Sequence, residues 1–139
     1  LHEVGGFVSH SQHHRHSYYI IRNAEMLGFT ENEKEIIANV ARYHRKSHPK
    51  AKHTDFAKLG LDDQLVVRKL SAILRVADGL DRSHTSSIKS IELKQDGKNI
   101  TFILHGDSSN IELEIWGAES KKKLFEDVFG VTAEFKRAD

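Results

Sequence analysis

Residues 1–21, LHEVGGFVSHSQHHRHSYYII, carry five of the ten histidines, so imidazole side chains are most concentrated in this stretch. Two later stretches carry further side chains that can bind metal or phosphate: 40–46, VARYHRK, and 74–81, LRVADGLD. Each stretch has an apolar spacing that is typical of a helix face. The sequence thus predicts a helical region in which side chains from several segments meet at one polar site.

The composition indicates a globular protein of one domain or two small ones. Of the 139 residues, 38% are hydrophobic and 29% are charged. No apolar run approaches the roughly 18 residues that span a bilayer, and no signal-peptide pattern is visible. The absence of cysteine excludes a disulfide framework and a thiolate zinc site. We expect a cytoplasmic protein without membrane contact.

Hydrophobic periodicity predicts that the first part is all helical. Residues 1–4 look like the last turn of a helix, with Gly5 as its left-handed cap. Thr30 and Glu33 form a capping box at the start of a later helix. The predicted helices and their buried stripes are 14–27 (Tyr19, Ile20, Asn23, Ala24, Leu27), 31 to 43 or 45 (Ile36, Ile37, Val40, Ala41, His44) and 62 or 63 to 79 (Val66, Val67, Leu70, Ile73, Leu74, Ala77).

The last third changes character from helical to mixed. The predicted elements are strands at 88–93, 99–105, 111–116 and 131–137 and a helix at 118–129. Asp96 and Gly97 are a turn signal that predicts a hairpin of the first two strands. We therefore expect an α+β fold, with a helical bundle in a domain over 1–84. A small antiparallel sheet with one helix would form a second domain over 85–139.

Four residues are candidate metal ligands because each lies on or beside an apolar face of a different predicted helix: His2, His16, His44 and Asp78. Such imidazole and carboxylate ligands suit a divalent ion such as Zn, Fe, Mn or Mg. A metal-bound water of lowered pKa would support hydrolysis of a phosphoester. The alternative is that these side chains are structural polar groups of the core.

A basic stretch at 41–58 contains Asp55 as its one acid, and it is a candidate phosphate-binding patch. The alternative is a solvated loop. The candidate phosphate-binding residues, inside and outside this stretch, are Arg15, Arg42, Arg45, Lys46, Lys50, Lys52, Arg75 and Arg82. His10, His13 and His14 are expected in a loop, where protonated imidazoles would assist. The remaining histidines, His48, His53, His84 and His105, are expected at the surface.

The stretches 1–21 and ARYHRKSHP (41–49) closely resemble the helical domain of the Ppx/GppA family of exopolyphosphatases and guanosine pentaphosphate phosphohydrolases. The order of elements in the tail is similar as well. The resemblance implies that the chain is the C-terminal part of a longer hydrolase, whose N-terminal actin-like domains carry a catalytic carboxylate, Mg²⁺ and Gly-rich loops. No loop of that form occurs among the nine glycines. It also implies a homodimer that handles polyphosphate or pppGpp.

The helical domain also resembles the HD-domain phosphohydrolases. By this resemblance His2 and Glu3 occupy the His-Asp doublet, His16 and His44 are additional ligands, and Asp78 is the terminal Asp. Glu3 departs from the pattern, because its extra methylene displaces the carboxylate from a metal whose distances tolerate only about 0.2 Å. The family's first His has no counterpart here. We therefore assign no catalytic residue.

Three hypotheses follow. The first is an accessory fragment that binds polyphosphate, pppGpp or another polyanion and supports dimerisation, with no certain cofactor. The second is an HD-type metal-dependent phosphohydrolase that acts on a nucleotide. The third is a module that binds RNA or other polyanions, although Tyr43 and Phe56 are the only aromatic residues in the basic stretch on which bases could stack.

Overall fold

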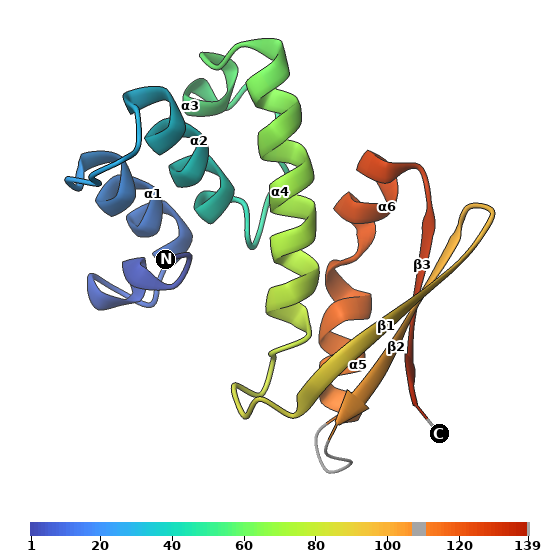
Figure 1. The fold of residues 1–139 in the computed structure, drawn as a ribbon. Coiled ribbons are helices and arrows are strands. Elements are labelled where there is room, and N and C mark those ends of the chain that lie inside the picture. Colours follow the sequence, from blue (N-terminus) through green and yellow to red (C-terminus); the bar gives the residue numbers. More distant parts are fainter. Residues whose placement is uncertain (107–110, 139) are drawn as a thin grey trace. The chain divides into compact units, whose positions relative to one another are not determined.

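The structure, a computed structural model, describes residues 1–106 and 111–138. In chain order the elements are the 3₁₀ helix η1 (Val4–Phe7), α1 (His13–Asn23), α2 (Glu31–Arg42), α3 (Thr54–Ala57), α4 (Leu61–Gly79), β1 (Ile88–Asp96), β2 (Asn99–Gly106), α5 (Ile111–Lys121), α6 (Lys123–Phe129) and β3 (Thr132–Arg137) (Figure 1). The predicted α+β class is confirmed. None of the helices among the described residues is both long and apolar enough to cross a bilayer.

The chain forms two compact units, Leu1–Ser71 and Ala72–Asp139. Their boundary falls within α4, whereas the predicted domains, 1–84 and 85–139, divide the chain after that helix. The first unit contains η1, α1, α2, α3 and the first part of α4. The second contains the end of α4, the three strands, α5 and α6 (Figure 1).

The start of α2 confirms the predicted capping box. The Thr30 hydroxyl accepts from the Glu33 amide at 3.1 Å, and the Thr30 amide donates to the Glu33 carboxylate at 2.8 Å. Two amides that the helix itself leaves without partners are thereby satisfied. The helix ends at Arg42, one residue before the nearer of its two predicted ends, Tyr43 and Arg45.

The buried face of α1 differs from the predicted stripe. The helix ends at Asn23, and Ala24 is already extended. The buried residues are His13, Ser17 and Ile21, spaced four apart. Tyr19 and Leu27 of the predicted stripe are 69% and 88% exposed. The error arose because the predicted helix was extended to Leu27, which rotated the inferred face away from the packed one.

The first turn of the chain also differs from the prediction. Gly5 is buried within η1 and does not cap a helix. Its amide donates to the Ser17 hydroxyl at 2.9 Å, and this hydroxyl donates to the His2 carbonyl at 2.7 Å. A Cβ on Gly5 would overlap the His13 carbonyl and approach the Ser17 Oγ to 2.7 Å. A glycine is therefore required for the close approach of η1 to α1.

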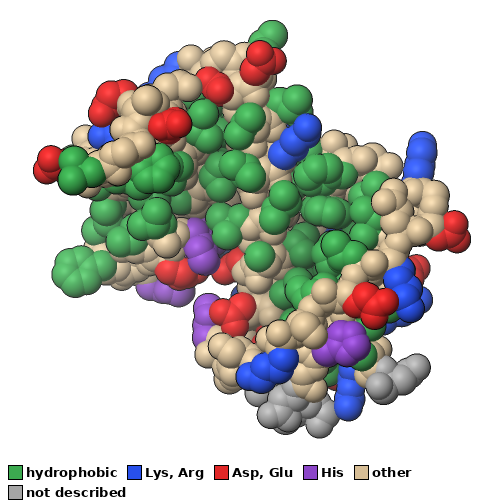
Figure 2. Space-filling model, viewed as in Figure 1, with side chains coloured by type: hydrophobic (Ala, Val, Ile, Leu, Met, Phe, Trp, Pro, Cys, Tyr) green, Lys and Arg blue, Asp and Glu red, His purple; other side chains and the backbone are tan. Residues whose placement is uncertain are grey.

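The predicted helix at 62–79 is confirmed as α4, but part of its predicted stripe is exposed. Val67 is fully buried. Val66, Leu70 and Ile73 are 41%, 45% and 47% exposed, and hydrophobic side chains are visible at the surface along this helix (Figure 2). Apolar residues thus occupy several faces of α4: Val67 and Val76 are buried in different clusters, while Val66, Leu70 and Ile73 stay exposed.

The second unit contains a three-stranded sheet of order β1-β2-β3. β1 and β2 form the predicted antiparallel hairpin, closed by the pair Asp96 and Asn99, with Gly97 at a φ of 58°. β3 pairs with β2 in parallel, so the sheet is mixed and the predicted all-antiparallel sheet is wrong. The connection from β2 to β3 runs through two helices, α5 and α6, as a crossover between parallel neighbours requires.

The predicted strand at 111–116 is the start of α5. Its alternation of apolar and acidic residues suggested a strand, but the buried residues Ile111, Glu114 and Ala118 follow a helical spacing. Glu114 is fully buried and accepts from the Ser83 amide at 3.2 Å and from the Ser83 hydroxyl. A buried acid with its own donors was not recognisable as a core position from its residue type.

Residues of α4, α5, β2 and β3 build the buried core of the second unit. Its buried members are Val76, Phe102, Leu104, Ile111, Ala118, Ala133 and Phe135. Phe102 and Phe135 stack with ring centroids 4.7 Å apart on neighbouring strands. In the first unit, two smaller clusters form around Ile21 and around Tyr43.

Gly5→Ala is expected to lower the free energy of unfolding by about 1–3 kcal/mol, the usual cost of forcing a methyl group into a packed site. Chemical denaturation followed by circular dichroism measures this change. Gly6→Ala is the matched control, because a Cβ on Gly6 would meet nothing within 4 Å. Equal stabilities of the two variants would show that η1 does not need the close contact.

Candidate functional site

Three metal-ligating side chains meet in the first unit: Glu3, His13 and His44. The Glu3 Oε1 lies 3.7 Å from the His13 Nε2 and 3.6 Å from the His44 Nε2, and the two Nε2 atoms are 3.1 Å apart. The side chains of His13 and His44 are 5% and 1% exposed, whereas that of Glu3 is 53% exposed. The cluster therefore lies at the surface with its imidazoles on the inner side.

Each member of the cluster comes from a different segment of the chain. His13 is the first residue of α1, and His44 follows the end of α2 by two residues. Glu3 directly precedes η1, where the Ser17 hydroxyl holds the neighbouring backbone. The Nε2 of His2 lies 3.7 Å from the Glu3 Oε1, so a third imidazole stands beside the cluster.

Hydrogen bonds define how the two inner imidazoles present their nitrogens. The His44 Nδ1 lies 2.6 Å from the Ala41 carbonyl. Because a carbonyl only accepts, this Nδ1 carries the proton and the His44 Nε2 offers its lone pair to the cluster. The His13 Nδ1 has two neighbours, the His10 carbonyl at 3.1 Å and the Arg45 Nη1 at 2.9 Å. It donates to the first or accepts from the second, and its tautomer differs accordingly.

The cluster overlaps the ligand set expected from the sequence only in part. His13 is a member, although it was expected in a loop. His16 is half-buried on α1 and falls outside the group. Asp78 belongs to the second unit, where its carboxylate pairs with Lys121. The assignment of these residues as metal ligands stays a prediction.

A signal for His13 was present in the sequence. His13, Ser17 and Ile21 share one face if the helix begins at residue 13. Ser17 obscured this face, because a small polar residue reads as solvent-exposed until its partners in another segment are known.

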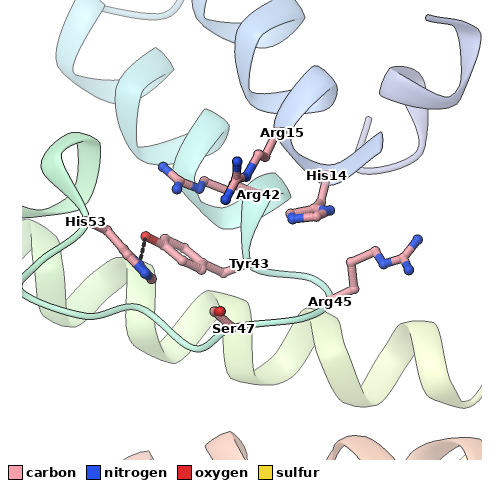
Figure 3. Close-up of a pocket in the computed structure, with 7 residues that line it drawn as sticks. All are labelled: His14, Arg15, Arg42, Tyr43, Arg45, Ser47 and His53. Atoms are coloured by element: carbon pink, nitrogen blue, oxygen red, sulfur yellow. Dashed lines mark hydrogen bonds between the residues drawn. The ribbon is translucent and has the colours of Figure 1, made fainter. Parts of the chain in front are cut away.

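A pocket in the same unit is rich in arginine. Its lining residues come from α1 and from the end of α2 and the loop after it: His14, Arg15, Arg42, Tyr43, Arg45, Ser47 and His53 (Figure 3). Three of the predicted phosphate-binding residues, Arg15, Arg42 and Arg45, are therefore brought together. The Arg15 and Arg42 side chains lie close together, while the Arg45 side chain extends away from them (Figure 3).

The arginines of the pocket differ in how firmly they are held. The Arg42 guanidinium lies 3.4 Å from the Asp55 carboxylate and 5.4 Å from the centre of the Tyr43 ring. The Arg15 side chain is exposed and makes no hydrogen bond or ion pair among the described residues. An anion that enters the pocket would therefore meet one anchored guanidinium and one that is open to it.

The pocket's charge comes from arginine and not from His14. Burial and the nearby Arg45 lower the pKa of His14 to about 4, so this imidazole is neutral at neutral pH. Its Nδ1 is buried without a hydrogen-bond partner among the described residues.

The other predicted phosphate-binding residues lie outside the pocket lining. Lys46, Lys50 and Lys52 are exposed on the loop between α2 and α3. Arg75 and Arg82 belong to the second unit. Arg75 is buried, which lowers its pKa, and the Arg82 guanidinium stands 5.6 Å from the centre of the Trp116 ring. The phosphate-binding roles of all these residues stay predictions.

Comparison with known proteins adds a family relationship. Residues 1–119 match the family model described as Ppx/GppA phosphatase, domain III. The chain is 33% identical over 105 residues to the guanosine-5'-triphosphate,3'-diphosphate pyrophosphatase of Pseudoalteromonas translucida (strain TAC 125). That alignment covers 73% of this chain and 20% of the relative. The matched region thus spans about a fifth of the length of this curated relative.

His53 is expected to titrate below the ordinary histidine pKa of 6.5, because burial first and Arg42 second disfavour its charged form. As the pH falls, the unfolded chain therefore binds a proton at His53 more readily than the folded chain does. The contribution of His53 to the free energy of unfolding is present above about pH 6.5 and is lost as the pH falls below that value. Imidazole resonances followed by NMR across the pH range measure the pKa directly. A pKa at or above 6.5 would contradict the expected positive environment, and His53→Gln should remove this part of the pH dependence.

Proposed function

Because the chain belongs to the Ppx/GppA phosphatase family, we propose that this fragment is an accessory module that binds the phosphate chain of polyphosphate or pppGpp. One observation supports the proposal most directly. Arg15, Arg42 and Arg45 line one pocket although they are up to 30 residues apart in the sequence. Clustered guanidinium groups are the usual means by which proteins bind phosphate.

The chemistry of the pocket suits a chain of phosphates. A guanidinium offers two parallel N–H donors to a phosphate, so its contacts have direction as well as charge. Because Arg15 makes no ion pair with any described residue, it would break none to make such a contact. Lys46, Lys50 and Lys52 add exposed positive charge on the neighbouring loop, which would attract further phosphates of a long anion.

Hydrolysis is proposed for another part of the protein. The related pyrophosphatase is about five times longer than the matched region, and the family resemblance implies actin-like domains that carry the reaction. The present module would hold the substrate's distal phosphates while those domains cleave a phosphoanhydride bond, so we assign it no catalytic residue.

Arg15→Glu is expected to weaken binding of long-chain polyphosphate about 10-fold or more, because a charge-assisted contact worth roughly 1.5–3 kcal/mol is lost and repulsion replaces it. Isothermal titration calorimetry at two salt concentrations measures the affinity, which should fall with salt. Lys69→Glu makes a comparable charge reversal at an exposed position of α4 outside the pocket and is the control.

Two results would count against this assignment. Equal affinities of Arg15→Glu and the parent would show that the pocket does not bind the anion. Displacement of polyphosphate by RNA at equal phosphate concentration would favour the general polyanion-binding module instead.

Metal-dependent hydrolysis of a nucleotide is the second candidate function. The observation that favours it is the cluster of Glu3, His13 and His44, since carboxylate and imidazole ligands support metal-activated water. Hydrolysis of this kind requires a bound divalent ion and a vacant coordination position for the substrate.

We also propose that the module supports dimerisation through α4. Four apolar residues of α4 are exposed at intervals of four, three and four positions: Val66, Leu70, Ile73 and Ala77. This is the spacing with which two helices pack side by side. A second copy of the chain presents the same seam, so the interface would be self-complementary.

Leu70→Lys is expected to weaken self-association by about 100-fold or more, because it removes an apolar contact of roughly 1.5–3 kcal/mol and buries a charge at the seam. Sedimentation velocity over a range of protein concentrations measures the change. Leu27→Lys introduces the same charge at an exposed leucine away from α4 and should leave association unchanged. A parent chain that stays monomeric at high concentration would overturn the proposal.

A further inference from the structure

We propose that Glu3, His13 and His44 form a binding site for a divalent transition-metal ion, with Zn²⁺ as the representative ion. This ligand set differs from the set expected from the sequence, because His13 takes part and His16 does not. The proposal does not depend on phosphate binding, since none of the three residues lines the arginine pocket.

The three ligand atoms have the spacing that one ion requires. Their separations are 3.1, 3.6 and 3.7 Å. A circle through three points at these separations has a radius of about 2.0 Å, and zinc bonds to imidazole nitrogen and carboxylate oxygen are about 2.0–2.2 Å long. An ion can therefore reach all three atoms at bonding distance without movement of their side chains.

The surroundings of the imidazoles also fit ligands. A metal-bound histidine usually donates its other ring N–H to a carbonyl or carboxylate, which fixes the tautomer. The His44 Nδ1 has such an acceptor in the Ala41 carbonyl, and the His13 Nδ1 has one in the His10 carbonyl. With both contacts made, the two Nε2 lone pairs face each other at 3.1 Å. That arrangement is repulsive unless a proton or a metal ion lies between them.

A competing arrangement exists without metal. If the Arg45 guanidinium donates to the His13 Nδ1, the His13 Nε2 carries the proton and donates it to the His44 Nε2. When an ion binds the His13 Nε2, the ring proton would move to the His13 Nδ1, which would then donate to the His10 carbonyl. Metal binding and the Arg45 contact thus exclude each other, so the two arrangements are distinguishable by experiment.

The ligand types favour an ion such as Zn²⁺ over Mg²⁺ or Ca²⁺. Two imidazoles and one carboxylate are borderline ligands, whereas the harder ions prefer oxygen alone. Glu3 is 53% exposed, so an ion can enter from solvent and keep a position for water or another ligand. His2, whose Nε2 lies 3.7 Å from the Glu3 Oε1, is a candidate for a fourth protein ligand.

The test is titration of the metal-free full chain with Zn²⁺ by calorimetry, with Co²⁺ as a spectroscopic probe of ligand number. The parent should bind one tight ion per chain. Glu3→Gln should weaken binding about 10-fold or more, and His13→Gln about 100-fold or more, because each removes a ligand. His16→Gln and His84→Gln are the controls for the other histidines and should bind as the parent does.

Glu3→Gln keeps the proposal testable if a buried histidine variant unfolds, because Glu3 is largely exposed and the substitution preserves its shape. Circular dichroism confirms the fold of each variant. The proposal is overturned if the parent binds no tight ion, if Glu3→Gln and His13→Gln bind Zn²⁺ like the parent, or if His16→Gln loses the ion.

Discussion

The Ser17 hydroxyl is the interaction on which the arrangement of the first unit depends. It accepts from the Gly5 amide and donates to the His2 carbonyl, so one side chain of α1 fixes two backbone groups of the opening segment. The missing Cβ of Gly5 permits this distance. Together with the packing of Val4 against the Ile21 cluster, that contact positions Glu3 relative to the imidazoles on α1 and after α2. The positions of the polar side chains at the site thus depend on the close backbone contact at Gly5, which a single methyl group would disturb.

A second set of polar contacts in the first unit is centred on Glu35 and Asp55. Glu35 is buried, pairs with Arg22 and Lys58, and accepts from the Tyr18 hydroxyl. Burial and this hydrogen bond raise the pKa of Tyr18, so it stays a donor at any physiological pH. Asp55 holds Arg42 at the other side. Asp55 therefore positions the Arg42 guanidinium, and neither Asp55 nor Glu35 lines the arginine pocket.

Sequence reasoning succeeded where a local rule decides the structure. The Thr30 and Glu33 capping box, the long helix α4 and the hairpin at Gly97 each follow from contacts within a few residues. It failed where a residue's role depends on a distant partner. Ser17 and Glu114 are buried polar groups satisfied by other segments, and neither residue type signals burial. The same reason explains His13, whose neighbours at the site come from residues 3 and 44. The family could be recognised from the sequence, because its motifs are continuous stretches.

The parallel pairing of β3 with β2 has a consequence for the order of folding. The β1–β2 hairpin closes over a two-residue turn, so its contacts are local and form early. β3 reaches β2 only after the 25 residues between them have formed α5 and α6, which places the last strand late. Until then one edge of β2 offers unpaired amides and carbonyls to any other extended chain. We therefore expect the half-made sheet to be a site at which the folding chain can misassociate.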